Sequence, residues 1–383
     1  MEPHEVYWEY INVVHQRPLT PLLANYSAMV GIAGAIFLFW GWARLRPVES
    51  DGAERRFALP VAVALMIAGL TNPILEVLQP GRVMNMYLFG WDVAGSAIIK
   101  FGVTLLPLFA LLCWWLGAAA LRPEIEAALH GRPAAVSAAG DLLTLWVRHF
   151  DPLAASCCRK AIISLGLLLA VFAILYSGVF LMTEHGIVFW DSAFLPVVFF
   201  ASAVAGGAGM LGLIVPLGRH LTGNAGEETA SGPYAGLLAA SVAGGALWLL
   251  WLQFTGHFGS VEVRRALDLV NGSRRGLAWG WWFGLGAVLP TLLLAVSPLR
   301  RIALFRYIAS AGAVIGAFAL RFAVLEIGQA VPKSGAGQYL YAPPAGMLSD
   351  LVLNWVYFVG WIALFWLLLP YRVRARGAAT TIA

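Results

Sequence analysis

The chain has 383 residues, of which 60% are hydrophobic and 12% charged, and its formal net charge is +5. Soluble domains carry about 25% charged residues, so this composition excludes a soluble globular protein and indicates an integral membrane protein. A basic excess in such a protein is typical of its loops and does not imply nucleic acid. We therefore expect contacts with membrane lipid and none with nucleic acid.

Nine windows are apolar enough to cross a bilayer, which requires about 20 mostly apolar residues. They cover residues 23–45, 57–79, 93–117, 160–182, 192–217, 231–255, 277–299, 302–327 and 349–371. This pattern predicts an all-α integral membrane protein with about nine transmembrane helices and its two ends on opposite sides. We divide the chain into an interfacial N-terminal segment (1–22), a polytopic membrane domain (23–372) and a tail (373–383).

The distribution of basic residues predicts the direction of the bundle. Fifteen Lys and Arg residues fall in the loops after the first, third, fifth and seventh spans and in the tail, against seven on the opposite side. By the positive-inside rule, the N-terminus is outside and residues 373–383 are cytoplasmic. The loop after the sixth span, HFGSVEVRRALDLVNGSRRG, departs from the rule. A partner protein facing Arg264 and Arg265 would explain this, as would ordinary tolerance of the rule.

Ionisable residues inside a membrane are costly and are therefore candidates for function. Arg306 lies close to the inner end of its span, and its long side chain can reach the membrane surface, so we set it aside. With the predicted direction, the other ionisable residues within the spans lie in the outer halves: Glu76, Lys100, Arg321 and Glu326. On the same side lie Asn25 and Tyr26, Tyr176, and a polar turn with His185 and Asp191. These groups could pair to hold the bundle together, but their one-sided clustering favours a functional site at the outer face.

The same inventory excludes several kinds of chemistry. None of the seven histidines lies in the middle of a span, whereas a membrane haem usually takes two such ligands. Three cysteines are too few for a four-thiolate iron–sulfur cluster. We expect no haem, iron–sulfur cluster or other metal site in this chain. A redox role would then need a diffusible carrier and a cofactor held by a partner.

Three blocks of sequence resemble the NrfD/PsrC family, the integral membrane subunits of polysulfide reductase and its relatives. The first block runs from Leu175 to Gly209, and its matching residues are Tyr176, Gly178, Trp190, Pro196, Phe199, Ser202, Ala203 and Gly207. The second contains Glu76, Pro80, Arg82, Ser96 and Gly102, and the third Arg321, Gly328 and Gln329. The resemblance covers most of residues 23–332.

This resemblance implies a function for the polar cluster. Members of the family are multi-pass anchors in the bacterial inner membrane that bind menaquinone or ubiquinone near the outer face. There they exchange electrons with an iron–sulfur subunit, which serves a molybdopterin catalytic subunit. The resemblance therefore implies a quinone-reactive subunit of an oxidoreductase complex with no activity alone.

We expect Tyr176 to hydrogen-bond one quinone oxygen, although an ordinary interfacial tyrosine is the alternative. We expect the other oxygen to be held by Tyr26 or Asn25. The alternative is His15 with Asn12, because the segment around these two residues resembles the family's first-helix segment. Candidates for proton transfer and charge stabilisation are Glu76, Asp191, His185, Lys100, Arg321 and Glu326, where Asp191 could instead cap a helix and His185 could be a solvated loop residue. Arg82 is expected to face a partner or lipid headgroups.

A secondary transporter or proton-translocating subunit without quinone chemistry is the rival interpretation. Transporters of that kind have repeated halves and helices broken near the midplane. The sequence contains no recognisable matching halves, and its charged residues lie towards one face. The terminal substrate and the direction of electron flow would depend on other chains.

Overall fold

The computed structural model describes residues 19–45, 52–76, 84–89, 97–150, 152–153, 156–222, 232–331 and 346–368. Within these residues, nine helices are long and apolar enough to cross a membrane, and this confirms the predicted fold class. They are α1 (Pro21–Leu45), α2 (Gly52–Glu76), α4 (Ala97–Ala120), α7 (Ser156–Met182), α8 (Phe194–Thr222), α9 (Gly232–Phe258), the π-helix η3 (Gly276–Val288) continued by α11 (Leu289–Ala295), α13 (Ala303–Ala330) and α14 (Met347–Leu368).

The helices follow from the apolar windows, because backbone groups in hydrocarbon must be satisfied within the segment itself. Most helix bounds differ from the predicted windows by a few residues, and one of these differences has a clear physical cause. The seventh span ends at Ala295 and not near residue 299, and Ser297–Arg301 form a separate short helix, α12. Pro298 lacks a backbone N–H, and Val296, two residues earlier, is extended (φ −81°, ψ 108°). The longer helix therefore cannot continue through this point.

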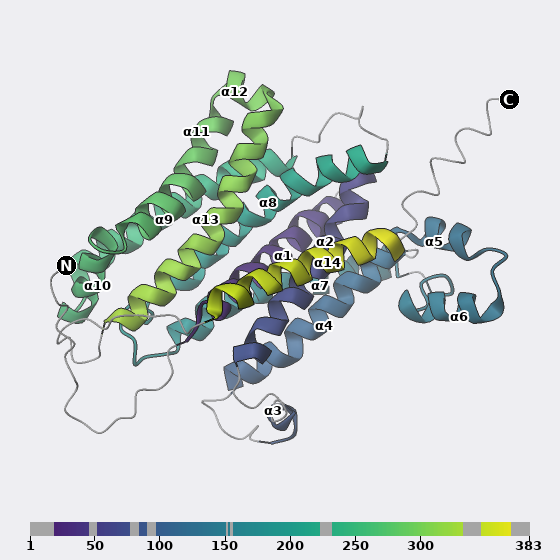
Figure 1. Ribbon diagram of the computed structural model, residues 1–383, viewed down its shortest axis with the longest axis horizontal. Helices are drawn as coiled ribbons and strands as arrows, with labels where there is room; N and C mark the ends of the chain where they lie inside the picture. The colour runs from purple at the N-terminus through teal and green to yellow at the C-terminus, as the bar shows by residue number, and fades with distance from the viewer. Residues whose placement is uncertain are drawn as a thin grey trace.

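Helix α1 lies at the centre of the bundle and packs against α2, α7, α8, α13 and α14. With α2, α4 and α7 it forms one group of helices, and α8, α9, η3–α11 and α13 form a second, whereas α14 lies along α2 (Figure 1). A helix that is apolar all round is typically buried, and 83% of the most apolar window of α1 is buried. Residues on α1 can therefore contact both groups.

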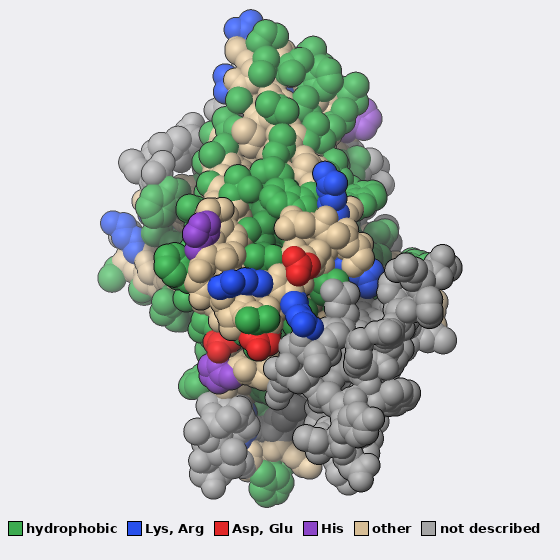
Figure 2. Space-filling model, turned by 90° about the vertical axis from the view of Figure 1, so that its left-hand side faces the viewer, with side chains coloured by type: hydrophobic (Ala, Val, Ile, Leu, Met, Phe, Trp, Pro, Cys, Tyr) green, Lys and Arg blue, Asp and Glu red, His purple; other side chains and the backbone are tan. Residues whose placement is uncertain are grey.

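The bundle has two ends, which we name after the short helices there. The α10 end carries α10 (Val261–Asn271), α3 (Asn85–Leu88), the start of α1 and the turn between α7 and α8 (Figure 1). The α12 end carries α12, α5 (Arg122–Leu129) and α6 (Ala134–Leu143). Seen from the α10 end, acidic, basic and histidine side chains gather on the end face, and the flank above them is hydrophobic (Figure 2). This is the distribution expected of a membrane protein viewed along its helices.

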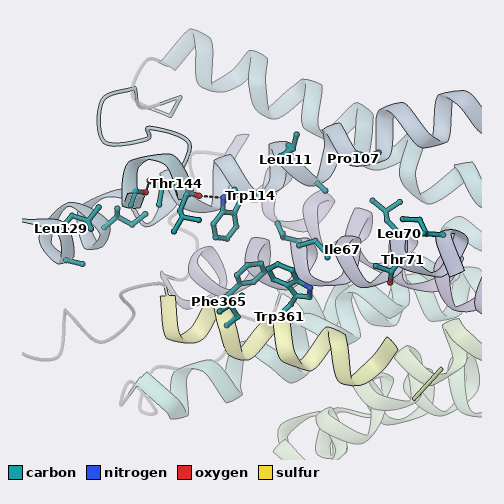
Figure 3. Close-up of a pocket in the computed structure, with 18 residues that line it drawn as sticks. Ile67, Leu70, Thr71, Pro107, Leu111, Trp114, Leu129, Thr144, Trp361 and Phe365 are labelled. Carbon is teal, nitrogen blue, oxygen red and sulfur yellow. Dashed lines mark hydrogen bonds between the residues drawn. The ribbon is translucent and has the colours of Figure 1, made fainter. Parts of the chain in front are cut away.

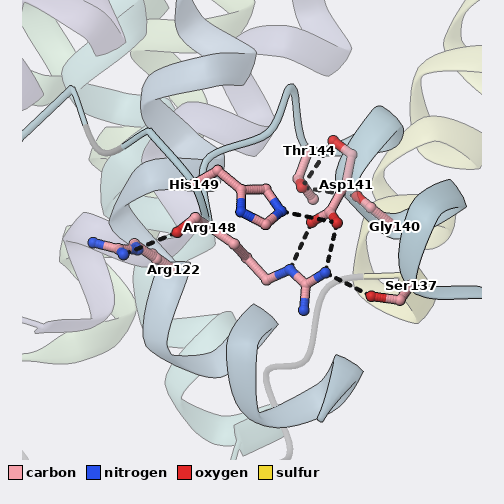
Figure 4. Close-up of polar contacts among 7 residues, drawn as sticks. All are labelled: Arg122, Ser137, Gly140, Asp141, Thr144, Arg148 and His149. Atoms are coloured by element: carbon pink, nitrogen blue, oxygen red, sulfur yellow. Dashed lines mark hydrogen bonds and ion pairs between the residues drawn. The ribbon is translucent and has the colours of Figure 1, made fainter. Parts of the chain in front are cut away.

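At the α12 end, an ion pair holds the turn that follows α6 (Figure 4). Both oxygens of Asp141 accept hydrogen bonds of 2.6 Å from Arg148, through Nε and Nη2. Between these two residues, Leu145 and Trp146 have positive φ angles of 52° and 56°, a costly conformation for side chains of this kind. The Arg148 guanidinium holds the pKa of the Asp141 carboxyl below its usual range. The pair therefore compensates for a strained turn.

Candidate functional site

A cavity of about 330 Å³ opens near the α10 end between α1, α2, α4 and α7. Its polar lining consists of three phenols and one carboxylate, from Tyr26, Tyr87, Tyr176 and Glu76, and its other walls include Leu23, Leu70, Pro73, Ile74, Ile99, Val103, Leu106, Pro107 and Phe180. We call this space the tyrosine cavity. An apolar pocket with a few convergent polar groups is the usual form of a small-molecule site.

Tyr176 on α7 and Tyr26 on α1 both line the tyrosine cavity. Both are buried, with 8% and 6% of their surfaces exposed. Neither hydroxyl makes a hydrogen bond to any residue that the structure describes. Since a buried phenol normally finds a partner, both hydroxyls are available to a ligand in the cavity.

Glycine 102 creates the space for the Tyr176 ring. A Cβ atom at Gly102 would overlap the Tyr176 hydroxyl and ring. The ring is also held between Phe172 and Phe180, with centroids 5.4 and 6.4 Å away. Packing on three sides therefore fixes where the phenol points.

The carboxylate of Glu76 closes the α10 end of the cavity together with the segment before α1. It accepts a hydrogen bond of 2.8 Å from the backbone N–H of Thr20 and a second, short one from the Thr20 hydroxyl. The backbone N–H of the neighbouring Leu19 donates to Gln329 Oε1 on α13 at 2.6 Å, and Gln329 Nε2 donates to the Leu19 carbonyl at 3.0 Å. A negative charge is favourable at a helix N-terminus, so Glu76 both lines the cavity and stabilises the start of α1.

Directly behind the two tyrosines, Arg321 is 1% exposed. Its guanidinium donates to Ser27 Oγ at 3.1 Å and to Ser202 Oγ at 3.0 Å, and to the carbonyls of Ala317 and Phe199. Ser27 in turn donates to Ser177 Oγ at 2.7 Å. Within the described part of the chain, its hydrogen-bond partners are all neutral. Arg321 is thus a buried cation that joins α13 to α1 and α8, and through Ser27 to α7.

Asn25, a candidate ligand, lies elsewhere. Its amide nitrogen donates to Asn72 Oδ1 on α2 at 3.1 Å and to Asn354 Oδ1 on α14 at 2.9 Å. Asn354 then donates to the Ala68 carbonyl and the Thr71 hydroxyl. Asn25 does not line the tyrosine cavity, and its contacts tie three helices together.

The remaining candidates are distributed over the α10 end. Lys100 is buried and donates to the Phe89 carbonyl at 2.8 Å, which anchors the end of α3. His185 and Asp191 form an exposed pair 3.2 Å apart in the α7–α8 turn. Glu326 pairs with Arg274 at 3.2 Å. None of these four candidates lines the tyrosine cavity.

Two candidates for partner contact lie on α10, where Arg264 is exposed and donates to the Gly259 carbonyl at 3.2 Å, and Arg265 is half-buried. The other candidates, Asn12, His15 and Arg82, lie outside the described residues.

Sequence reasoning missed Thr20, Tyr87, Ser27 and Ser177. One signal for the serines was present, because the dipeptide Tyr-Ser occurs at residues 26–27 and again at 176–177. Consecutive residues in a helix point about 100° apart, so each dipeptide sends its tyrosine into the cavity and its serine towards Arg321. Tyr87, which donates to the Val103 carbonyl at 2.6 Å, has no comparable signal.

Trp190 belongs to the first of the three blocks that resemble the family, and it contacts α13, which carries the third block. The indole Nε1 of Trp190 donates to the Val324 carbonyl at 2.8 Å. A Cβ atom at Gly328 would overlap the same indole ring. The α7–α8 turn is thereby locked to α13, behind the tyrosine cavity.

Within the described residues, nine apolar spans with α1 at their centre, and a cavity near one end of the bundle, define a polytopic membrane subunit with a candidate small-molecule site. Among the residues that the structure describes, no group of three or more His, Cys, Asp or Glu could hold a metal ion. Residues 17–333 match the family described as polysulphide reductase, NrfD, and the chain belongs to this family of membrane subunits of oxidoreductase complexes. The predicted family is confirmed. No curated protein sequence matches the chain.

Proposed function

We propose that the chain is the quinone-reactive subunit of a respiratory oxidoreductase and that the tyrosine cavity receives the quinone headgroup. The observation that carries this proposal is the pair of buried phenols, Tyr26 and Tyr176, whose hydroxyls have no partner in the described part of the chain. A quinone has two oxygens on opposite sides of a flat apolar ring. Two phenols in a largely apolar cavity of about 330 Å³ fit that ligand.

Each polar group of the cavity has a separate task in this proposal. Quinol supplies two electrons and two protons when it is oxidised. Tyr176 donates a hydrogen bond to one quinone oxygen, and Tyr26 holds the other. We favour Tyr26 over Asn25 because Tyr26 lines the cavity, whereas the Asn25 amide nitrogen donates to Asn72 and Asn354. The Glu76 carboxylate lies in the same cavity and can accept a proton. Arg321 adds positive charge behind both tyrosines.

The electrons have to leave through another chain. Family members typically work with iron–sulfur and molybdopterin subunits. We propose that these dock at the α10 end, because the tyrosine cavity is near it and Arg264, Arg265 and Arg274 provide basic contacts there. With the predicted direction, this is the outer face of the bacterial inner membrane.

Binding of quinone to the purified chain tests the proposal without any partner. Menaquinone or ubiquinone should raise the unfolding temperature of the wild-type protein, since a ligand that binds only the folded state stabilises it. The shift should be reduced in Tyr176→Phe and in Tyr26→Phe. Tyr234→Phe is the matched control, because Tyr234 is buried near the other end of the bundle and donates to the Gly212 carbonyl. Equal shifts in all four proteins would contradict the proposal.

A transporter without quinone chemistry remains the alternative. It would require ionisable groups near the midplane. Arg321 is buried between neutral partners in the outer half of its span, and no described carboxylate accompanies it. A wild-type protein that gains no stability from either quinone would favour the transporter.

A further inference from the structure

A second and larger cavity of about 830 Å³ runs along the outside of the same helices (Figure 3). It is bounded by α2 and α4 on one side, by α14 on the other, and by α5 and α6 at the α12 end. On α2 its lining extends from Val63 to Ile74, which is roughly 16 Å at about 1.5 Å per residue. We call this space the apolar groove.

The walls of the groove select against a polar occupant. Its two hydroxyls are already engaged, since Thr144 donates to the Gly140 carbonyl at 2.8 Å and Thr71 to the Ala68 carbonyl at 2.7 Å. The indole N–H of Trp114 donates to the Leu143 carbonyl at 2.8 Å. The exception is the Trp361 N–H, which is buried without an acceptor in the described residues. One neutral donor cannot compensate for the burial of a charged headgroup, so the groove fits hydrocarbon.

The groove and the tyrosine cavity share three lining residues. Leu70 and Ile74 on α2 and Pro107 on α4 line both spaces. The two spaces therefore adjoin each other at the seam between α2 and α4. A molecule seated with its polar end at Tyr176 would pass these three residues on its way into the apolar groove.

We propose that the apolar groove holds the polyisoprenoid tail of the quinone whose headgroup occupies the tyrosine cavity. This assignment rests on the proposed quinone function. It explains why a hydrocarbon groove begins at the wall of a cavity that has polar groups for a quinone headgroup. Because the surrounding lipid is as apolar as the groove, transfer of the tail from lipid into the groove contributes little hydrophobic free energy to binding. Its contribution is to direct the tail along α2 and α4 and so orient the headgroup.

Photo-crosslinking in membranes that contain the assembled complex tests this assignment directly. One probe is a polyisoprenyl quinone with a diazirine at the far end of the tail, and its twin carries the diazirine on the ring. The ring probe should label α7 around Tyr176, and the tail probe should label residues 107–114 and 361–365. Ring labelling at Tyr176 with tail labelling elsewhere would overturn the tail path alone. Ring labelling away from the tyrosine cavity would overturn the proposed function itself.

A pair of substitutions on α4 supplies the matched control. Ala110 lines the groove but not the tyrosine cavity, whereas Leu108 is exposed and lines neither. Ala110→Trp should lower tail-probe labelling and raise the KM for long-tail quinol at least fivefold, with the KM for a short-tail quinol unchanged. Leu108→Trp should change neither. The proposal would be overturned if Ala110→Trp had the same KM as wild type for long-tail quinol. It would also be overturned if a phospholipid occupied the groove in place of the quinone tail.

Discussion

Ser27 on α1 donates a hydrogen bond of 2.7 Å to Ser177 on α7, and each serine directly follows a tyrosine that lines the tyrosine cavity. Arg321, which does not line the cavity, donates to Ser27 at 3.1 Å. The distance between the two tyrosines is therefore set by a buried serine pair and by the cation that holds it. The register of α1 against α7 therefore helps to determine where the two tyrosines lie in the cavity.

Arg321→Lys should separate this positioning role from simple charge. Lysine keeps the positive charge but lacks the guanidinium's planar set of five donors, and it cannot reach all four acceptors. Each lost hydrogen bond from a charged donor costs about 1.5–3 kcal/mol of unfolding free energy. Thermal unfolding should show the loss, and the KM for quinol should rise. Arg306→Lys, whose guanidinium lies 5.4 Å from the Tyr234 ring centroid, should shift stability by less than about 1 kcal/mol.

Gly102→Ala should displace the Tyr176 ring, because the added methyl would overlap its hydroxyl. We expect a folded protein with weakened quinone binding, measured as a smaller stabilisation by added quinone. Gly280→Ala is a suitable control, since a Cβ atom there meets no atom within 4 Å. Quinone stabilisation of Gly102→Ala equal to that of the control would remove Tyr176 from the ligand's path.

Glu76→Gln should lower quinol-linked turnover of the assembled complex by about 10²-fold, the lower end of the effect of a general base. Glutamine keeps an oxygen that can accept from the Thr20 N–H, so the amount of folded protein should stay the same. Glu326→Gln removes a carboxylate that pairs with Arg274 and does not line the cavity. Turnover of that variant should remain near wild type, and a common loss in both variants would point to general destabilisation.

The turn after α6 should loosen in acid. Because Arg148 lowers the pKa of Asp141 in the folded protein, the stabilisation by this pair is complete above the unfolded pKa of about 3.9. It is lost as the pH falls through the lower, folded pKa. The protection of the amides of residues 141–150 from hydrogen exchange should therefore stay high from neutral pH to about pH 4. Below that pH the protection should fall. Asp141→Asn should exchange quickly at neutral pH, whereas Asp268→Asn on α10 should not affect this segment.

The fold was predictable from the sequence because membrane spans depend on a local property, the length of an apolar run. The predicted start of the second apolar run at residue 57 agrees with its apolar span, Phe57–Glu76. Other helix ends differ from the predicted windows by a few residues, and at the seventh span the Val296–Pro298 break explains the difference.

The candidate site was harder to predict because it depends on which polar residues meet across helices. Asn25 and Tyr26 are adjacent in sequence, yet one binds Asn72 and Asn354 and the other faces the cavity. No local pattern reveals that residue 354 lies beside residue 25. Similarly, the resemblance placed Glu76 in the site, but its partner Thr20 lies in a segment without any motif. The one-sided clustering of ionisable residues pointed to the end of the bundle where the tyrosine cavity lies, and packing decided the individual contacts.

The central claim is that Tyr176 contacts quinone, and turnover of Tyr176→Phe in the assembled complex tests it most directly. The measurement is the rate of quinol oxidation, or of quinone reduction, at varied quinol concentration, beside Tyr234→Phe as the control. The phenol hydroxyl makes no hydrogen bond within the described residues, so its removal should leave the fold intact. We predict a loss of at least tenfold in kcat/KM for Tyr176→Phe and no change for the control. Wild-type kcat and KM in Tyr176→Phe would contradict the assignment.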